Sequence, residues 1–575
     1  TVHNGQSATV GYRYDPFGNR IRTILPDGRH IDYLYYGSGH LHQISLDGEV
    51  VSDIERDKLH REIQRTQGSI SSLYDYDPMG RLKSQRTVWS GTQTPRGKQT
   101  PLAGGAVNRR YAYDKAGNLI QSADQRSGVL NYVYDKIGRI QEARNSQTGR
   151  SETFAFDPAH NILSDKAAEG RGNNLTGGNR LESYNGIEYT YDALGNLIYR
   201  QLPNGENQYY QYDLENQLVR AEIKKVAGNT EIWTYAYDPF GRRLSKERQD
   251  KLAWTSTDPK RTHFVWDGSR LLQEYTYKGS YTYIYTDQDS YEPLAQVFQN
   301  NRDEKQYLAY FHNDQIGIPR EMTDIHGNLL WYGEYTAWGR LKKNERVYQN
   351  AHQPFRLQNQ YFDEETGLHY NLMRYYEPEV GRFVNQDPIG LWGGGNLYQF
   401  APNAQTWVDA LGLSKALWGR GGFDSWFDSA SIADVRKAMA DPNSRDAIKG
   451  ALRNGGGAHE WFPVSMATKA KELGFTASEL KELTTPTSDV WFKDIPDPKN
   501  PGEFLEGPHS AGKTLPKGQS SRASSIAHDM LGDKLEGAKT KRGAIQRIRN
   551  FAERYTRGGQ DSVGGCGQVK RKRKK

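Results

Sequence analysis

A repeated Tyr-x-Tyr-Asp segment that runs into a tight turn is the feature that most constrains the fold of this chain. In most copies, alternating aromatic residues lead into a D-x-x-G-N or D-x-x-G-R turn, and a second segment begins with Leu or Ile. Alternation with a period of two is typical of a β-strand, and a short glycine turn between two such segments predicts a β-hairpin. The nearest copies lie 21 or 22 residues apart, and degenerate copies fill the longest gap. The aspartates of the eight clear copies are Asp15, Asp77, Asp114, Asp135, Asp157, Asp192, Asp213 and Asp238.

The hairpins must stack side by side, because a two-stranded hairpin cannot bury a row of aromatic rings by itself. We therefore expect one long antiparallel β-sheet that stays open or curls. The chain is polar, with a mean hydropathy of −0.86, but 12% of its residues are aromatic and its 76 basic and 69 acidic residues nearly balance, which excludes overall disorder. The turns require a positive φ, which glycine adopts without steric cost. The turn glycines are Gly18, Gly80, Gly117, Gly138, Gly195 and Gly241.

Other features of the sequence exclude further classes of protein. Cys566 is the single cysteine, so an intrachain disulfide framework is impossible. No run approaches the roughly 18 apolar residues of a membrane span, and the sequence begins at Thr1 with neither a methionine nor a signal-like apolar core. We therefore expect a soluble piece of a longer protein.

Two segments downstream of the repeats carry a family resemblance. YFHNDQIGIPREMTDIHGNLLWYGEYTAWGR (310–340) and YFDEETGLHYNLMRYYEPEVGRFVNQDPIGLWGGGNLYQFAPN (361–403) resemble the core of Rhs proteins, and the upstream units resemble YD repeats. Rhs proteins are polymorphic toxins that include the insecticidal toxin-complex C subunits, and the likeness spans roughly residues 10–413. It implies an all-β YD-repeat shell, a long spiralling sheet of hairpins, that encloses a smaller α or α+β toxin domain. On this basis residues 1–360 form the shell, 361–413 its C-terminal plug, and 414–575 the toxin with a basic tail.

Two related motifs stand at the end of the plug, DPIGL from Asp387 and DALGL from Asp409, and their aspartates are 22 residues apart. Two carboxyl groups brought together in a dry cavity cannot both ionise, so one can act as an acid while the other activates water against a peptide carbonyl. The resemblance implies that this pair is an aspartyl autoprotease that needs no cofactor, with Arg382 in support and Leu413-Ser414 as the scissile bond. Alternatively, the two motifs are turns that merely close the shell.

The C-terminal segment differs from the repeats in charge and in predicted structure. Residues 414–575 contain 29 basic and 19 acidic residues, whereas residues 1–413 contain 47 and 50. Helical spacing of apolar residues occurs at 432–453, 466–483 and 540–556. A basic helix followed by a lysine- and arginine-rich tail favours binding to the phosphates of DNA or RNA, although a solvated helical face would have a similar composition. The candidate contacts are Arg547, Arg549, Arg554 and Arg557.

Three histidines of this segment form a candidate metal site. His459 follows a triple glycine and opens an apolar run, His509 lies in EGPHSAGK, and His528 lies in a predicted helix. The pattern resembles HNH-type nucleases, in which one divalent ion polarises the scissile phosphate while a base activates water. This resemblance assigns His459, His509 and His528 as ligands of Mg²⁺ or Zn²⁺ and Glu460 as the base in place of the usual second histidine. Lys513 stands where a further ligand histidine is expected.

Two other functions stay open at this stage. The segment could be an ADP-ribosyltransferase toxin, with Arg453, Ser525 and either Glu460 or Glu553 in its site. The chain could also be a non-enzymatic surface or adhesion protein, like animal YD-repeat receptors. The sequence does not decide whether the protein forms oligomers. The Rhs resemblance instead implies secretion through type VI machinery, attachment to a VgrG-type spike by a missing N-terminal region, a cognate immunity protein, and delivery into the cytoplasm of target bacteria.

Overall fold

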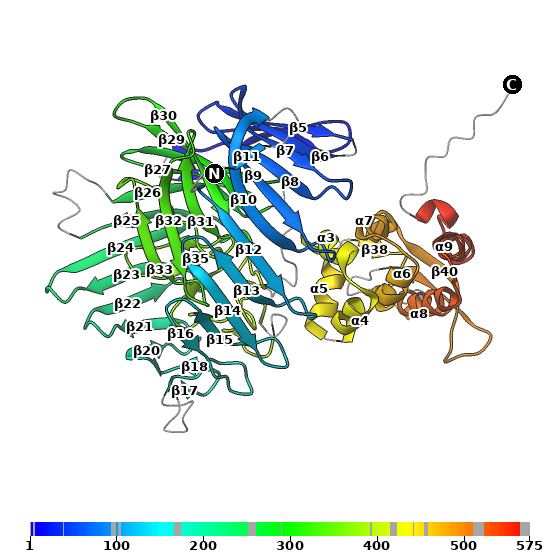
Figure 1. Cartoon of the computed structure of the whole chain (residues 1–575). Helices are drawn as coiled ribbons and strands as arrows, with labels where there is room; N and C mark the ends of the chain where they lie inside the picture. The colour runs from blue at the N-terminus through cyan, green and yellow to red at the C-terminus, as the bar shows by residue number, and fades with distance from the viewer. Residues whose placement is uncertain are drawn as a thin grey trace. The chain divides into compact units, whose positions relative to one another are not determined.

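The protein is described by a computed structural model, which divides the chain into two compact units, Thr1–Ala416 and Leu417–Lys575 (Figure 1). The predicted boundary after Leu413 lies three residues before this division. Residues 361–413 belong to the same compact unit as the repeats rather than to a unit of their own. The structure describes residues 2–3, 6–37, 39–93, 99–101, 105–165, 174–250, 260–288, 290–390, 394–413, 422–440, 442–452, 458–509 and 522–563.

The first repeats form a 14-stranded sheet in which consecutive strands pair antiparallel in chain order, with one short strand, β11, paired beside β10. This confirms the predicted array of hairpins. Its strands are β3 (Gly11–Tyr14), β4 (Arg20–Ile24), β5 (His30–Tyr36), β6 (His40–Leu46), β7 (Glu49–Arg56), β8 (Glu62–Gln67), β9 (Ile70–Tyr76), β10 (Leu82–Gln93), β11 (Gln99–Pro101), β12 (Asn108–Tyr113), β13 (Leu119–Asp124), β14 (Gly128–Tyr134), β15 (Ile140–Asn145) and β16 (Ser151–Thr153).

The later repeats form a second, 15-stranded sheet with the same consecutive antiparallel order. Its strands are β19 (Ser183–Tyr184), β20 (Ile187–Tyr191), β21 (Leu197–Gln201), β22 (Asn207–Tyr212), β23 (Leu218–Lys224), β24 (Thr230–Tyr237), β25 (Arg243–Arg248), β26 (Arg261–Asp267), β27 (Arg270–Thr276), β28 (Gly279–Tyr285), β29 (Pro293–Asn300), β30 (Gln306–Asn313), β31 (Pro319–Asp324), β32 (Leu329–Tyr335) and β33 (Leu341–Arg346). Two short hairpins pair β1 (Val2–His3) with β2 (Gln6–Ser7) and β17 (Leu175–Thr176) with β18 (Arg180–Leu181).

The sequence predicts one continuous sheet, but the structure has two, and the break follows the copy at Asp157. There the flanking segments are reduced to a single bridge between Phe156 and Ile162. The residues after Ile162, LSDKAAEGRGNN, are polar and lack the period-two alternation that a strand with one buried face requires. The repeat pattern therefore stops and restarts at this point of the sequence.

The aspartate of each repeat organises its turn through both carboxylate oxygens. At Asp15, Oδ1 accepts the backbone N–H groups of Phe17 (2.9 Å) and Asn19 (2.9 Å), while Oδ2 accepts the side-chain amide of Asn19 (2.8 Å). Gly18 has a φ of +88°, as the turn requires, and every other predicted turn glycine is also at positive φ. The D-x-x-G-N/R pattern thus encodes a turn whose aspartate is hydrogen-bonded by other residues of the same turn.

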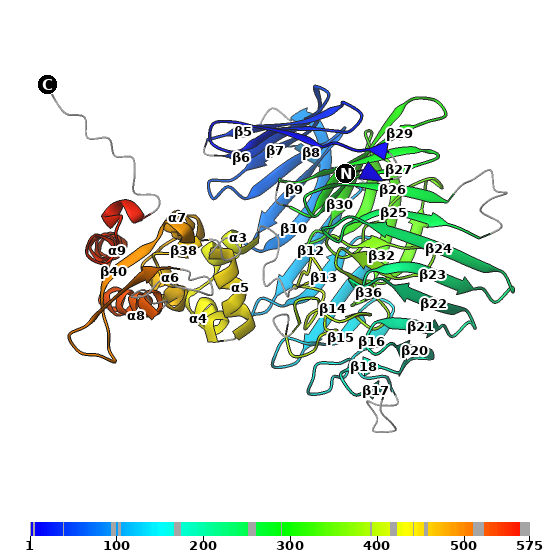
Figure 2. The ribbon, with the colours of Figure 1, turned by 180° about the vertical axis from the view of Figure 1, so that it is seen from behind.

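The two sheets contact each other through an apolar cluster and a set of hydrogen bonds. The cluster joins Ile31 and Ile44 of the first sheet to Leu272 and Ile284 of the second. In addition, the Gln67 side chain donates to the Phe311 carbonyl (2.9 Å) and the Ser69 N–H donates to the Ile325 carbonyl (2.7 Å). Figure 2 shows β9 and β10 beside β30.

The segment after the repeats folds as a small four-stranded sheet that packs into the main core of the first unit. Its aromatic residues share that core with β20 to β32. A buried ion pair adds to the attachment, because both terminal nitrogens of Arg243 donate to the Asp363 carboxylate at 2.5 and 2.8 Å. The strands are β34 (Tyr361–Phe362), β35 (His369–Asn371), β36 (Arg374–Glu377) and β37 (Arg382–Phe383).

The second unit is an α+β domain with its own apolar core, which agrees with the predicted class. All three predicted helical stretches contain helices, and α3 and α8 lie outside those stretches. No helix in the described parts of the chain is long and apolar enough to span a membrane. The elements are α3 (Gly422–Ser429), α4 (Ile432–Ala440), α5 (Pro442–Leu452), β38 (Ala458–Glu460), η3 (Val464–Met466), α6 (Ala467–Glu472), α7 (Ala477–Glu482), β39 (Thr484–Pro486), η4 (Thr487–Asp489), β40 (Trp491–Pro496), β41 (Phe504–Pro508), α8 (Arg522–Glu536), α9 (Lys541–Tyr555) and η5 (Gly559–Ser562).

Candidate functional site

The two aspartates of the DPIGL and DALGL motifs meet at one arginine. Nη2 of Arg374, on β36, lies 3.2 Å from Oδ2 of Asp387 and 3.3 Å from Oδ2 of Asp409. All three side chains are buried, with at most 5% of each side chain exposed. The structure thus brings together the two carboxyl groups that the sequence predicted as a pair, although they are 22 residues apart in the chain.

Burial controls the ionisation of this site. Desolvation raises the pKa of Asp387 above its ordinary value, and the Arg374 charge and the Ile389 N–H only partly oppose it. Desolvation likewise lowers the pKa of Arg374, against the attraction of the two carboxylates. Both shifts disfavour charge in a dry site, so Asp387 is suited to carry a proton.

The predicted scissile bond begins at the residue that Asp409 binds. The N–H of Leu413 donates to Oδ1 of Asp409 at 3.1 Å, so the carboxylate lies beside the backbone of the last residue before the bond. Ser414, on the other side of the bond, lies outside the described residues.

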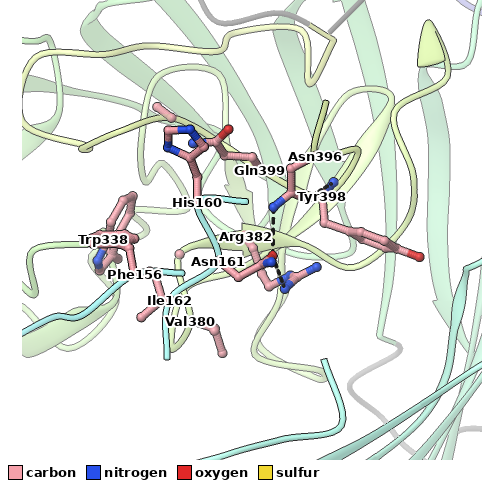
Figure 3. A pocket seen from close by; sticks show the side chains of 12 residues that line it. Phe156, His160, Asn161, Ile162, Trp338, Val380, Arg382, Asn396, Tyr398 and Gln399 are labelled. Carbon is pink, nitrogen blue, oxygen red and sulfur yellow. Dashed lines mark hydrogen bonds between the residues drawn. The ribbon is translucent and has the colours of Figure 1, made fainter. Parts of the chain in front are cut away.

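The predicted supporting residue, Arg382, binds residues of the repeats, and its role in cleavage stays a prediction. Figure 3 shows its side chain directed toward Asn161, to which Nη1 donates at 3.3 Å. Nη2 donates to the carbonyl of Asn179, and the guanidinium carbon lies 4.8 Å from the centre of the Tyr398 ring. Arg382 therefore ties the small sheet to a repeat turn, and Arg374 is the arginine that contacts the aspartate pair.

The sequence contained a signal for Arg374 that the prediction missed. Arg374 stands in an aromatic segment, RYYE, in which all four residues are buried. A buried guanidinium needs acidic partners, and the two nearest motifs downstream each begin with an aspartate.

The three histidines predicted as metal ligands also lie together, in the second unit. His459 is on β38, His509 follows β41 directly, and His528 is on α8. Each ring offers a nitrogen, and these three atoms all lie within 4.8 Å of one another. Three segments that are far apart in the sequence therefore place their imidazoles at one point.

The surroundings of the cluster fix the orientation of its rings. Nδ1 of His528 lies 2.8 Å from the Ser524 carbonyl, which can only accept a hydrogen bond from it, so in the neutral ring Nε2 is the lone-pair nitrogen. The ring of His459 packs edge-on against Trp461, with 4.5 Å between the centroids, and the Trp461 indole is held by the Ser562 carbonyl at 2.9 Å. Such outer contacts are typical of histidines that hold a metal ion.

The residues present fit a zinc-like ion better than magnesium. Three neutral imidazoles suit Zn²⁺, whereas Mg²⁺ prefers oxygen ligands. Three histidines with a fourth position left open are also the ligand number of catalytic zinc sites. Oε1 of Glu460, which is 2% exposed, lies 3.9 Å from Nε2 of His528, so a carboxylate borders the cluster.

The arginines predicted to contact nucleic acid have intramolecular partners. Nη1 of Arg547 donates to the Lys534 carbonyl at 2.7 Å, near the end of α8. Arg557 pairs with Glu506 and its guanidinium carbon lies 4.2 Å from the centre of the Trp491 ring. Arg554 lies 5.2 Å from the ring of Tyr555, and Arg549 is half-buried on α9.

Of the residues of the transferase alternative, Ser525, Glu460 and Glu553 lie in the described parts of the chain. Ser525 is exposed on α8, and Glu553 is exposed on α9, where its carboxylate accepts the N–H of Gln560 at 3.1 Å. Arg453 and Lys513 lie outside the described residues.

Comparisons with known proteins place the repeat region in a family. Residues 308–345 match the family model described as RHS protein. A double-stranded DNA deaminase toxin A from Burkholderia cenocepacia is 37% identical over 427 residues, or 72% of this chain and 29% of that protein. A probable deoxyribonuclease RhsB from Dickeya dadantii is 30% identical over 464 residues, or 76% of this chain and 30% of that protein.

Among solved structures, the TcdB2–TccC3 crystal structure matches with a TM-score of 0.48 and 18% identity, covering 71% of this chain and 22% of that one. The chain spans about a third of the length of the curated relatives it matches.

Proposed function

Because this chain belongs to the Rhs protein family, we propose that it is the C-terminal part of a secreted antibacterial effector whose repeat shell carries the second unit as a toxin. The relatives named as a DNA deaminase toxin and a deoxyribonuclease support a toxic activity on nucleic acid. The family resemblance favours delivery by a type VI, VgrG-type spike into the target cytoplasm, and a cognate immunity protein in the producer.

The toxin is released by self-cleavage after Leu413, and the contact of Arg374 with both aspartates is the observation that supports this step. Asp409, as carboxylate, takes a proton from a water molecule whose oxygen attacks the Leu413 carbonyl carbon. Asp387, protonated, gives its proton to the departing Ser414 nitrogen. The C–N bond breaks, Leu413 ends as a carboxylic acid and Ser414 as an amine, and one water is consumed.

A denaturing gel of freshly expressed protein tests the cleavage. We expect the wild type to migrate as two fragments that separate after residue 413, whereas Asp387→Asn and Asp409→Asn remain full length. A wild type that stays as one band under all conditions would refute the proposal and favour the adhesion-protein alternative.

The released unit is a metal-dependent nuclease of DNA or RNA, and the observation that supports this activity is the convergence of His459, His509 and His528. A divalent ion held by these rings would supply the Lewis acid that polarises the scissile phosphate. Glu460 borders the cluster and accepts the proton of the attacking water. The basic charge of residues 414–575 favours an anionic substrate.

Degradation of plasmid DNA and of total RNA by the purified, cleaved protein tests this activity. We expect degradation that EDTA abolishes and that His459→Ala removes. His326→Ala, which changes an exposed turn of the repeats, is the matched control. Intact nucleic acid in the presence of zinc, together with transfer of label from NAD, would instead support the transferase.

A further inference from the structure

The backbone carbonyls of residues 409–412, which directly precede Leu413, each accept a hydrogen bond. The carbonyl of Asp409 accepts a hydrogen bond from the Asn371 side chain at 2.9 Å, and that of Ala410 accepts one from the Asn359 side chain at 2.6 Å. The carbonyls of Leu411 and Gly412 accept hydrogen bonds from Met373 and Arg374. Every carbonyl from residue 409 to residue 412 therefore has a donor.

The donors for the last two carbonyls come from the start of β36. The N–H of Met373 donates to the Leu411 carbonyl at 3.4 Å, and Nε of Arg374 donates to the Gly412 carbonyl. Arg374 thus holds the backbone of the cleaved strand with one nitrogen while Nη2 contacts the two aspartates.

Gly412 fits this groove because it lacks a side chain. Its φ is +66°, and a Cβ added there would lie 2.6 Å from the carbonyl oxygen of Asn371. The close approach allows the strand to lie directly on the backbone of the small sheet. The glycine of the DALGL motif therefore serves docking as well as turn geometry.

Asn359 anchors the same strand to the large sheet. Its side-chain amide donates to the Ala410 carbonyl and also to the Ser269 carbonyl (3.0 Å), in the turn between β26 and β27. Asn359 itself is held at a positive φ of +59°. The docked strand is therefore fastened to two parts of the first unit that are far apart in the sequence.

We infer that residues 409–413 stay bound in the site after cleavage, so that the shell retains its own product strand and cuts only once, in cis. This inference rests on the proposed self-cleavage. Hydrolysis breaks the bond after Leu413 and adds one water across it, whereas every hydrogen bond described above lies before that bond. None of them is lost when the toxin is released.

The new Leu413 carboxylate adds an acid to a site that contains one arginine. The site can accommodate it because the reaction leaves one carboxyl group protonated, since Asp409 keeps the proton that it took from water. Arg374 then faces two negative charges, Asp387 and the new terminus, rather than three. Asn359 and Asn371 act as positioning residues, since they touch the strand and not the reacting atoms.

Digestion of the fully cleaved protein by carboxypeptidase Y, followed by intact mass measurement of the shell fragment, tests the retention. We expect the folded fragment to keep Leu413, whereas the same fragment denatured in urea loses it. Equal loss from both samples would overturn the inference. A protein that is never cut would contradict the proposed function instead, so the two failures are distinguishable.

Two further measurements use the same protein. In cleaved Asn371→Ala and Asn359→Ala shells, carboxypeptidase Y should remove Leu413 at least tenfold faster than in the wild type. Other regions of the shell should stay protected from hydrogen exchange. An unchanged rate of Leu413 removal contradicts the role of both residues. Cleaved wild-type shell mixed with full-length Asp387→Asn protein should leave the variant intact. Cutting of the variant in trans would overturn the inference.

Discussion

Replacing Arg374 by methionine tests whether one guanidinium sets the ionisation of both aspartates. The substitution keeps the unbranched stem of the side chain but removes a charge that lies 3.2 and 3.3 Å from the two carboxylates. A charge pair about 4 Å apart at an effective dielectric constant of about 20 is worth roughly 4 kcal/mol. Arginine beside an aspartate lowers its pKa by about 1–3 units. Both carboxyl groups should therefore lose this shift together.

The rate of self-cleavage should respond in both size and pH dependence. The reaction needs Asp409 ionised and Asp387 protonated, so the rate rises with pH through the first pKa and falls with pH through the second. Loss of the guanidinium raises the pKa of Asp387 further, so the falling limb of the pH profile moves to higher pH. Loss of the roughly 4 kcal/mol attraction to the carboxylate that must be ionised should slow cleavage at the former optimum by about 10- to 1000-fold.

Pulse-labelled synthesis in a cell-free system, sampled over time at pH 5 to 9, gives this rate from the ratio of full-length to cleaved bands. Arg374→Lys is the matched control, because it keeps the charge but loses the planar fork that reaches Gly412. It should cut more slowly at an unchanged pH optimum. An Arg374→Met protein with the wild-type rate and optimum would refute the reasoning.

Three other changes have expected outcomes. Gly381→Ala should lower the thermal unfolding midpoint measured by calorimetry, because its φ is +67° and a Cβ there would lie 2.4 Å from the Trp338 ring; the cost should exceed the roughly 1 kcal/mol of a strained backbone alone. Glu460→Gln should retain zinc, measured by mass spectrometry of the metal, yet lose nuclease activity, whereas His528→Ala should lose both. Arg382→Gln should still cleave itself on a denaturing gel, since Arg382 contacts the repeats and not the aspartate pair.

The sequence predicted what local periodicity encodes and missed what depends on long-range pairing. Alternation and the turn chemistry of Gly18 identified the hairpins, because both are set by neighbouring residues. The histidine cluster was recoverable because imidazoles are rare in the second unit. The family resemblance assigns Arg382, although Arg374 also stands near the motifs in the chain. Only the register of β36 against β37 decides which one faces the carboxylates.

Asp409 reuses the turn of the repeats, with its second oxygen directed at Arg374. In the repeat at Asp77, Oδ1 accepts the N–H of Arg81, four residues on, at 3.0 Å, while Oδ2 pairs with the Arg81 side chain at 2.7 Å. At Asp409 the first contact is kept, because Oδ1 accepts the N–H of Leu413. Leucine cannot bind the second oxygen, so Oδ2 faces Arg374 instead. The change from Asn or Arg to Leu at the fifth position of the motif therefore converts a structural carboxylate into one available for chemistry.

This argument predicts the effect of restoring the repeat pattern at Leu413. Leu413→Asn gives Oδ2 of Asp409 a local amide donor like that of Asn19 in the first repeat, where the contact is 2.8 Å. Self-cleavage should slow by at least tenfold, whereas Leu413→Met, which offers no donor and has a similar volume, should cut at nearly the wild-type rate. Both rates come from the same pulse-labelling experiment. If the two variants cleave equally fast, a local donor to Oδ2 of Asp409 does not control the rate, and the argument is wrong.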